Sequence, residues 1–281
     1  MTQKRVITIQ DISCIGKCSL TVALPILSAA GIETSILPTA ILSTHTGGFA
    51  GFTFRDLTDD VIPVTEHWKT LDIRVDAIST GYLGSEQQQQ LIAGIFKDFK
   101  QEGTIILVDP AMADQGKFYP AFDQHFALGM RDLCRQADII VPNLTEASFM
   151  LEKPYLGEDY DQAYIEETLL QLAALGPRQA VLTGVSFEPG RLGAAAYDRE
   201  LDSFEYYFTE KIEGYYHGTG DIYSCALLAG ILNGKSLADA IRIACEFTVA
   251  AIRRTKEAGT DPKFGVEFEC ELGGLIELLK D

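Results

Sequence analysis

The feature that most constrains this chain is a regular alternation between short apolar runs and segments with helical periodicity. The apolar runs have the length and composition of buried strands, and they lie at residues 6–10, 34–42, 76–84, 104–112, 137–143 and 180–185. Helical segments at 19–31, 87–100 and 164–176 separate several of them. This alternation predicts an α/β three-layer sandwich, with a mostly parallel central sheet and helices on both faces.

The pattern changes between residues 192 and 208, where GAAAYD and LDSFEYYF indicate two short strands joined by a charged turn at 198–200. Two strands joined in this way predict an antiparallel hairpin at the edge of the sheet. Further helical segments follow at 221–232, 237–254 and 272–279. No linker, internal repeat or block of charge divides the chain, so we expect a single domain over residues 1–281.

The charge of the chain limits its partners. A formal net charge of −17 and a pI of about 4.6 argue against binding to nucleic acid through a basic surface. No stretch has the roughly 18–20 apolar residues that a membrane span requires, and the N-terminus lacks the apolar core of a signal peptide. We therefore expect a cytoplasmic protein with no membrane or nucleic-acid partner. An acidic protein can still hold a phosphate on backbone N–H groups.

The candidate functional residues follow the ends of the expected strands. In an open parallel sheet, ligands bind at the carboxyl ends of the strands. The residues found there are rich in glycine and polar side chains, and they are Asp11, Ser13, 43–48, 81–84, Asp109, 143–146, Thr183 and Gly184.

The most informative motif is Gly218-Thr219-Gly220-Asp221, directly before a helical segment. Glycines at a helix N-terminus expose backbone N–H groups that can hold a phosphoryl group. Asp221, expected at the first helical position or its cap, could accept a proton from a hydroxyl that attacks a phosphate. The alternative is that Asp221 only caps the helix and the glycines only allow a tight turn. The chain has neither a GxxxxGK[ST] loop nor a GxGxxG motif after its first strand.

A second motif, Asn143-x-x-Glu146, follows the strand expected at 137–143. A carboxylate and an amide at a strand end can hold Mg²⁺ directly or through water. The alternative is that Thr145 caps the next helix and Glu146 stabilises its positive end. Asp109 is a further candidate to orient a metal ion or phosphates.

These motifs resemble those of the pyridoxal, pyridoxine and pyridoxamine (vitamin B6) kinases of the ribokinase superfamily. The matching segments extend through most of the chain, and they are IQDISCIGKCS, LSTHTG, TGYLGS, VDPAM, IIVPNLTE, HGTGDIYSCALLAG and CEFTVAAIRRT. The resemblance implies an enzyme, an ATP-dependent kinase that phosphorylates the 5′-hydroxymethyl group of a B6 vitamer. It also implies Mg²⁺, often a monovalent cation, and a homodimer.

The resemblance also implies a role for each site residue. Asp221 would be the base, and Gly218, Thr219 and Gly220 would form the anion hole. Asp109, Asn143, Thr183 and Gly184 would bind the nucleotide, with Glu146 and Asn143 holding Mg²⁺, directly or through water. Thr46 and Tyr82 would contact the pyridine, with Asp11 and His45 beside them.

Three features leave alternatives open. Asp11 stands where these kinases commonly have serine, so it could pair with a protonated pyridine or the amine of pyridoxamine, or it could point away and only end its strand. His45 could contact the substrate or order its loop. Residues 113–126 could form a mobile flap that excludes water or a plain connection.

Other functions share the same motifs. A hydroxymethylpyrimidine kinase, or a sugar or nucleoside kinase of the same superfamily, would also contain GTGD and NxxE. A B6-binding carrier without turnover is the non-enzymatic alternative. Asp11, Thr46 and Tyr82 are the residues that distinguish among substrates.

Overall fold

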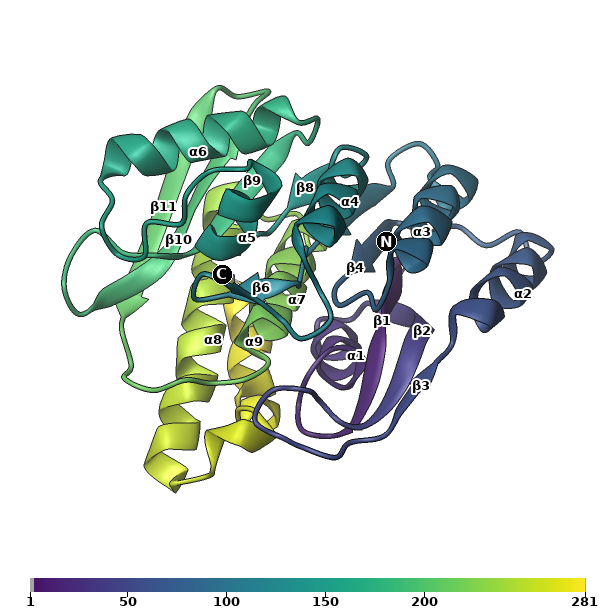
Figure 1. The fold of residues 1–281 in the computed structure, drawn as a ribbon, viewed down its shortest axis with the longest axis horizontal. Coiled ribbons are helices and arrows are strands. Elements are labelled where there is room, and N and C mark those ends of the chain that lie inside the picture. Colours follow the sequence, from purple (N-terminus) through teal and green to yellow (C-terminus); the bar gives the residue numbers. More distant parts are fainter. Residues whose placement is uncertain (1–2, 281) are drawn as a thin grey trace.

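The centre of the fold is one nine-stranded sheet with the strand order β11-β10-β9-β8-β5-β4-β1-β2-β3, shown in Figure 1. The structure is a computed structural model that describes residues 3–280. The strands of this sheet span Arg5–Ile15 (β1), Glu33–Thr44 (β2), Phe54–Asp56 (β3), Ala77–Thr80 (β4), Ile105–Val108 (β5), Ile139–Ile140 (β8), Gln179–Val185 (β9), Arg191–Asp198 (β10) and Ser203–Glu210 (β11). The strands from β9 across to β2 pair in parallel. The hairpin of β10 and β11 at one edge and β3 at the other are antiparallel.

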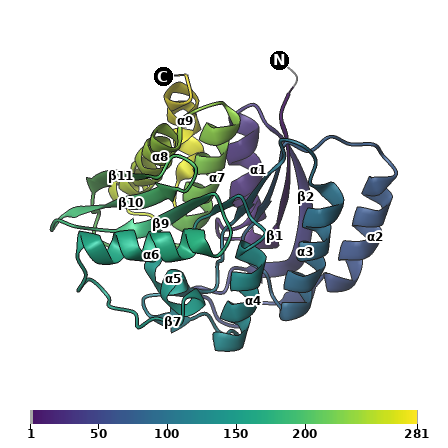
Figure 2. The same ribbon diagram turned by 90° about the horizontal axis from the view of Figure 1, so that it is seen from above.

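Helices cover both faces of the sheet. They span Leu20–Ala29 (α1), Thr58–Lys69 (α2), Glu86–Phe99 (α3), Gln124–Cys134 (α4), Leu144–Met150 (α5), Gln162–Ala174 (α6), Thr219–Leu232 (α7), Leu237–Ala258 (α8) and Leu272–Leu278 (α9), with short 3₁₀ turns at Pro262–Phe264 and Phe268–Glu271. Helices α2 to α6 lie on one face, and α1, α7, α8 and α9 lie on the other, as Figure 2 shows. The predicted α/β sandwich and its edge hairpin are confirmed.

Two hydrophobic cores hold the layers together, because successive strand residues point to opposite faces. In β1, Ile7 and Ile9 belong to the core under α2 to α6, whereas Val6 belongs to the core under α1, α7 and α8. All three side chains are 0% exposed. Burial of one such side chain stabilises the fold by about 1.5–3 kcal/mol, so a strand that is apolar on both sides is stable only between two helical layers.

The order of the strands creates the crevice that holds the site. The chain passes from β1 through α1 to β2, and later returns to place β4 on the other side of β1. Helix α1, which follows β1, and helix α3, which follows β4, lie on opposite faces of the sheet. Loops that leave neighbouring strands toward opposite faces open a crevice at the carboxyl ends.

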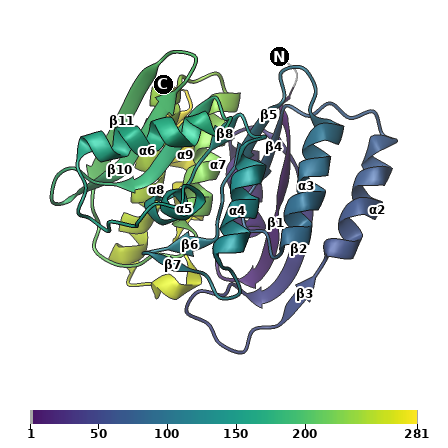
Figure 3. The same cartoon turned by 45° about the horizontal axis from the view of Figure 1, so that its top comes forward.

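Residues 113–126 form a small hairpin followed by the start of α4. Its strands are Ala113–Asp114 (β6) and Lys117–Phe118 (β7), and Figure 3 shows the hairpin beside α5. Gly116, in the turn, donates its N–H to Thr145 Oγ1 at 3.0 Å. The segment therefore has structure of its own, while its mobility stays a prediction. Within residues 3–280, the chain forms no helix that is both long enough and apolar enough to cross a membrane.

Candidate active site

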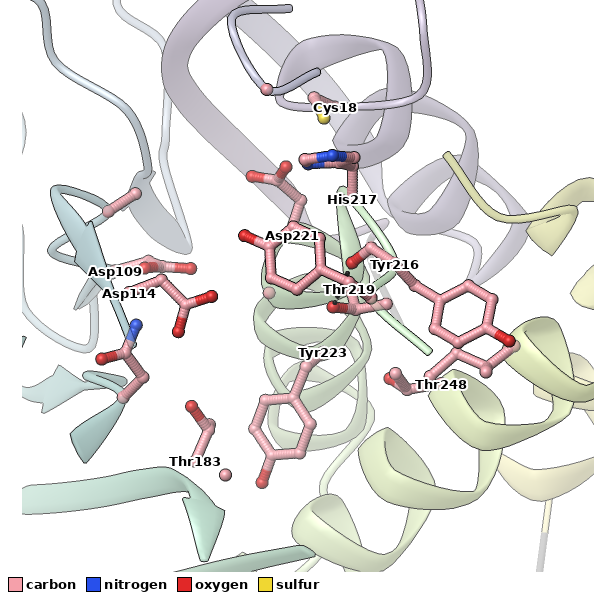
Figure 4. A pocket seen from close by; sticks show the side chains of 18 of the residues that line it. Cys18, Asp109, Asp114, Thr183, Tyr216, His217, Thr219, Asp221, Tyr223 and Thr248 are labelled. Atoms are coloured by element: carbon pink, nitrogen blue, oxygen red, sulfur yellow. Dashed lines mark hydrogen bonds between the residues drawn. The ribbon is translucent and has the colours of Figure 1, made fainter. Parts of the chain in front are cut away.

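A cavity of about 550 Å³ lies at the carboxyl ends of the parallel strands, and every site residue predicted from the sequence lines it. These residues are Asp11, His45, Thr46, Tyr82, Asp109, Asn143, Glu146, Thr183, Gly184, Gly218, Thr219, Gly220 and Asp221. Figure 4 shows Asp221 and Asp109 facing one another across this cavity, with Thr183 and Tyr223 at one end. The fold thus brings together residues from widely separated parts of the chain, and their individual roles remain proposals.

The N-terminus of α7 forms a corner of the cavity that is suited to bind an anion. Gly218 is its N-cap and has a left-handed backbone (φ 78°, ψ 1°). A Cβ atom at this position would lie 2.0 Å from the carbonyl oxygen of Lys17, so only glycine fits. The first hydrogen bond of the helix is donated by Ile222 to Gly218 O, at 3.1 Å. The N–H groups of the residues between these two have no helical acceptor, and they can receive an anion.

Asp221 lies at this corner, although not where the sequence suggested. The helix begins at Thr219, so Asp221 is inside its first turn and is neither its first residue nor its cap. Its Oδ2 accepts a hydrogen bond from Ser19 N at 2.9 Å. Burial raises the pKa of Asp221 to about 7, an effect that the Ser19 N–H opposes and the negative charge of Asp11 increases. A carboxylate with a pKa near the working pH is suited to act as a general base.

Asn143 and Glu146 cap the N-terminus of α5. The Asn143 side chain accepts a hydrogen bond from Glu146 N, and Glu146 Oε2 accepts one from Asn143 N, which makes a capping box. The suggestion that Thr145 caps this helix is therefore wrong. Glu146 Oε1 also accepts a hydrogen bond from Met112 N at 3.1 Å. Backbone donors hold this carboxylate at the edge of the cavity, as a metal-binding role requires.

The cavity is strongly acidic. Its lining includes the carboxylates Asp11, Asp109, Asp114, Glu146, Glu210 and Asp221, and none of the described residues that line it is a lysine or an arginine. Burial and the charge of Asp221 raise the pKa of Asp109 to about 8, against a hydrogen bond from Ser224. Burial, together with the charge of Asp109, also raises the pKa of Glu146 well above its usual range.

This set of donors fits a hard cation. Oxygen ligands without a neighbouring cationic side chain suit Mg²⁺, which usually binds one or two carboxylates together with water and phosphates. Within residues 3–280, no group of three or more His, Cys, Asp and Glu side chains could hold a metal ion. Glu146 and Asn143 would therefore share Mg²⁺ with the phosphates of a nucleotide.

The same cavity contains the residues expected to contact a substrate ring. Asp11 lies within β1 and does not follow it, at a point where the register between β1 and β2 shifts. It is 4% exposed, and its Oδ2 accepts a hydrogen bond from Ser13 Oγ at 3.1 Å. Because Asp11 lines the cavity, the alternative that it points away is wrong. Burial and the charge of Asp11 raise the pKa of Tyr82 to about 12, so Tyr82 is a neutral hydrogen-bonding group.

Both ring nitrogens of His45 form hydrogen bonds that order its loop. Its Nδ1 accepts a hydrogen bond from Gly47 N at 3.1 Å, and its Nε2 lies 2.7 Å from Lys263 O. The first contact leaves Nε2 as the protonated nitrogen, which donates to the carbonyl. Burial lowers the pKa of His45, although the Lys263 carbonyl opposes this. A neutral ring with both nitrogens occupied can offer a substrate only its face.

The sequence did not indicate several other residues of the cavity wall. At the end near Thr183, the wall is made by side chains from β10 and from the helices α7 and α8, namely Leu192, Tyr223, Thr248, Val249 and Ile252. Thr248 Oγ1 is buried and has no hydrogen-bond partner in the described structure. The β6–β7 hairpin adds Asp114, and the loop before α1 adds Cys18 and Ser19. A hydroxyl inside the apolar helix α7 was the one available signal for Tyr223.

The three-layer fold, the anion-binding helix N-terminus and the acid inside its first turn define a small-molecule phosphotransferase of the ribokinase-like class. A model of the phosphomethylpyrimidine kinase family matches residues 25–264, and the chain belongs to that family.

Individual relatives agree with this assignment. The chain is 30% identical to the pyridoxine kinase of Bacillus subtilis over 185 residues, which cover 65% of this chain and 66% of that protein. It is similar in structure to the pyridoxal kinase of Lactobacillus plantarum, with a TM-score of 0.90 and 30% identity over 99% of this chain and 98% of that one. A Bacteroides thetaiotaomicron protein crystallised with pyridoxal has a TM-score of 0.93 and 36% identity over 98% and 96% of the two chains. The resemblance to the vitamin B6 kinases is confirmed.

Proposed function

We propose that the protein transfers the γ-phosphoryl group of ATP to the 5′-hydroxymethyl group of a B6 vitamer. The observation that carries this proposal is that one cavity is lined both by Asp221, in the first turn of α7, and by Asp11, Thr46 and Tyr82. Pyridoxine kinase and pyridoxal kinase among the relatives support it.

In this proposal, each group has a part in the reaction. Asp221 accepts the proton of the substrate hydroxyl as that oxygen attacks the γ-phosphorus. A new oxygen–phosphorus bond forms, the bond to the bridging oxygen breaks, and ADP leaves with the electron pair. The free N–H groups at the start of α7 hold the charge that grows on the transferring phosphoryl group. Mg²⁺, when bound at Glu146 and Asn143, would neutralise charge on the phosphates.

The nucleotide is expected to extend from this corner toward Thr183 and Gly184. The apolar side chains of Leu192, Val249 and Ile252, which line the same cavity, suit a base. The monovalent cation, the homodimer and the cytoplasmic location also remain predictions. Sedimentation of the purified protein would test the dimer.

A second candidate is phosphorylation of a hydroxymethylpyrimidine. The family model and a Rhizobium meliloti relative, a hydroxymethylpyrimidine/phosphomethylpyrimidine kinase that is 26% identical over 84% of this chain and 86% of that protein, favour it. Both substrates carry a hydroxymethyl group on a flat nitrogen heterocycle, so the same base and anion corner could serve either.

The experiment that separates the candidates is a substrate panel. The purified protein is incubated with Mg-ATP and, separately, pyridoxal, pyridoxamine, pyridoxine and hydroxymethylpyrimidine, and both ADP and phosphorylated product are measured. Turnover of the pyridines supports the proposal. Turnover of the pyrimidine alone assigns the protein to the second function, and binding of a vitamer without turnover with ATP would indicate a carrier.

A further inference from the structure

Ser19, at the start of α1, has a backbone conformation that serine rarely adopts. Its dihedral angles are φ 56° and ψ −128°, a combination that is accessible to glycine and costs other residues about 1–3 kcal/mol. Ser19 is only 4% exposed, and it lines the cavity. Strain of this kind persists where the surrounding structure imposes it, and such positions are often functional.

The strained conformation directs the Ser19 N–H at the proposed base. The N–H donates to Asp221 Oδ2 at 2.9 Å. On the other side of the same residue, Ser19 O accepts hydrogen bonds from Val22 N at 3.0 Å and Ala23 N at 2.9 Å, which begin α1. Hydrogen bonds from α1 therefore hold the carbonyl group of Ser19, and Asp221 holds its N–H group. The N–H group consequently has a fixed direction.

The rest of the loop makes this arrangement rigid. Lys17 N donates to Phe264 O at 3.2 Å, and the Lys17 carbonyl lies so close to Gly218 that a Cβ atom there would be 2.0 Å away. The loop before α1 is thus packed against the turn that forms the anion-binding corner. A displacement of Ser19 would therefore disturb both Asp221 and the turn at Gly218.

Ser19 also reaches the second acid of the cavity. Burial raises the pKa of Asp11, and side-chain hydrogen bonds from Ser19 and Ser13 oppose this rise. Ser19 therefore donates a backbone hydrogen bond to Asp221, and its side chain acts on the pKa of Asp11. The backbone and the side chain can be tested separately, because alanine and glycine lack the hydroxyl but keep the N–H.

We propose that Ser19 is a positioning residue for phosphoryl transfer, whose backbone N–H holds one carboxylate oxygen of Asp221 and leaves the other directed at the substrate hydroxyl. This inference rests on the proposed function through the role of Asp221 as base. Misplacement of a reacting group by about 1 Å can cost about 10²-fold in rate, so a single well-placed N–H has a measurable effect on turnover.

Three substitutions test the inference. Ser19→Gly accepts the same backbone angles without strain and keeps the N–H, so its loss of kcat should be far smaller than that of a variant that displaces the N–H. Ser19→Ala keeps the N–H and removes the hydroxyl, and it should act mainly on the KM of the vitamer. A β-branched residue at positive φ is a severe outlier, so Ser19→Val should displace the N–H and lower kcat by about 10- to 100-fold.

A double-mutant cycle distinguishes an effect of Ser19 through Asp221 from a general folding defect. If Ser19 acts through Asp221, Ser19→Val should have little further effect on the residual kcat of Asp221→Asn. Circular dichroism and Tm identify any variant that has failed to fold, in which case Ser19→Thr, a milder β-branched change, takes its place in the cycle. Equal losses in both backgrounds, or a glycine variant as slow as the valine variant, would overturn the inference. If Asp221→Asn itself keeps wild-type turnover, the proposed function of that residue fails instead.

Discussion

Asn143 and Glu146 hold each other in place, because each side chain accepts a hydrogen bond from the other residue's backbone N–H, at 2.9 Å in both directions. The same pair that starts helix α5 thereby presents a buried carboxylate to the cavity. Structural and functional interpretations of the NxxE motif are therefore compatible, and only a measurement that responds to the metal ion can separate them.

The first prediction concerns that metal ion. Glu146→Gln keeps the capping arrangement, because glutamine also serves in a capping box, but removes the charge. We expect the Mg²⁺ concentration for half-maximal turnover to rise by about 10- to 100-fold. Ser85, whose side chain caps α3 by accepting from Gln88 N, provides the control. Ser85→Ala should cost about 1 kcal/mol of stability without changing the Mg²⁺ titration, and an unchanged titration in Glu146→Gln would remove Glu146 from the metal site.

The second prediction concerns the base. Asp221→Asn should lower kcat by about 10²- to 10⁴-fold. Burial, against the N–H of Ser19 and together with the charge of Asp11, places the pKa of Asp221 at about 7, and only the deprotonated carboxylate can accept a proton. In wild type, kcat/KM for the vitamer should therefore rise with pH through about 7 and then level off. A rate that is independent of pH between 5.5 and 8.5 would contradict this role.

The third prediction concerns stability. The folded protein raises the pKa of Asp221 from 3.8 to about 7, so folding favours the protonated acid. Ionisation of the buried Asp221 therefore lowers the free energy of unfolding. This effect is absent below a pH of about 4, grows as the pH rises and is complete above about 7. Without ligands, Asp221→Asn should therefore melt a few degrees above wild type at pH 8 and at the same temperature near pH 4, in thermal scans monitored by circular dichroism.

Asp198 provides the matched control of opposite sign. It is also buried, and although burial acts to raise its pKa, hydrogen bonds from Gln179, Leu201 and Arg178 lower the pKa below its usual value. Its charge stabilises the fold at neutral pH, and this stabilisation is lost as pH falls through the lowered pKa. Asp198→Asn should thus lower Tm at pH 8, whereas a higher Tm would refute the electrostatic explanation for both residues.

The fourth prediction compares two glycines of the same motif. A Cβ atom at Gly218 would meet Lys17 O at 2.0 Å, whereas one at Gly220 would meet nothing within 4 Å. Gly218→Ala should lower both Tm and kcat. Gly220→Ala should leave Tm unchanged or raise it, since alanine is the better helix former, while the added methyl group near the phosphate lowers kcat by about tenfold. Full activity of the Gly220 variant would mean that the phosphate binds elsewhere.

The fifth prediction concerns the choice of vitamer. Asp11 is buried, and the described residues that line its cavity include no lysine or arginine, so a cationic group of the substrate is its natural partner. Loss of a charge-assisted hydrogen bond costs about 1.5–3 kcal/mol. Asp11→Ser should lower the kcat/KM for pyridoxamine relative to that for pyridoxal by about 10-fold or more. Ser13→Ala, which removes only the hydroxyl that donates to Asp11, should change this ratio far less, and an unchanged ratio in Asp11→Ser would contradict the assignment.

The long parallel core of the fold was predictable, because strands such as β1 and β9 are apolar over several residues and follow the expected alternation. Helix α5 has seven residues, which are too few to show helical periodicity, and only the NxxE motif at its start suggested a helix. Helix α2, which contains Pro63, was not predicted, whereas the helix that contains Pro25 was. Helices α2 and α5 are stabilised by packing against the rest of the fold, and a local sequence pattern does not show such packing.

The site was predictable where chemistry is encoded in adjacent residues, as in Gly218 to Asp221. It was not predictable where the fold alone brings residues together. The contact between Ser19 and Asp221 joins positions that are 202 residues apart, and the unusual backbone of Ser19 has no signature in the sequence. Thr248 is one polar residue among many on α8, and only the cavity distinguishes it.

The absence of lysine and arginine from the described cavity wall has a consequence for the cell. A nucleotide site that carries no cation of its own must take its positive charge from the surrounding solution. If Mg²⁺ fills that role, the supply of the free ion, as well as the supply of ATP, sets the flux through the enzyme. Starvation for magnesium would then slow cofactor salvage even while the vitamer and the enzyme are abundant.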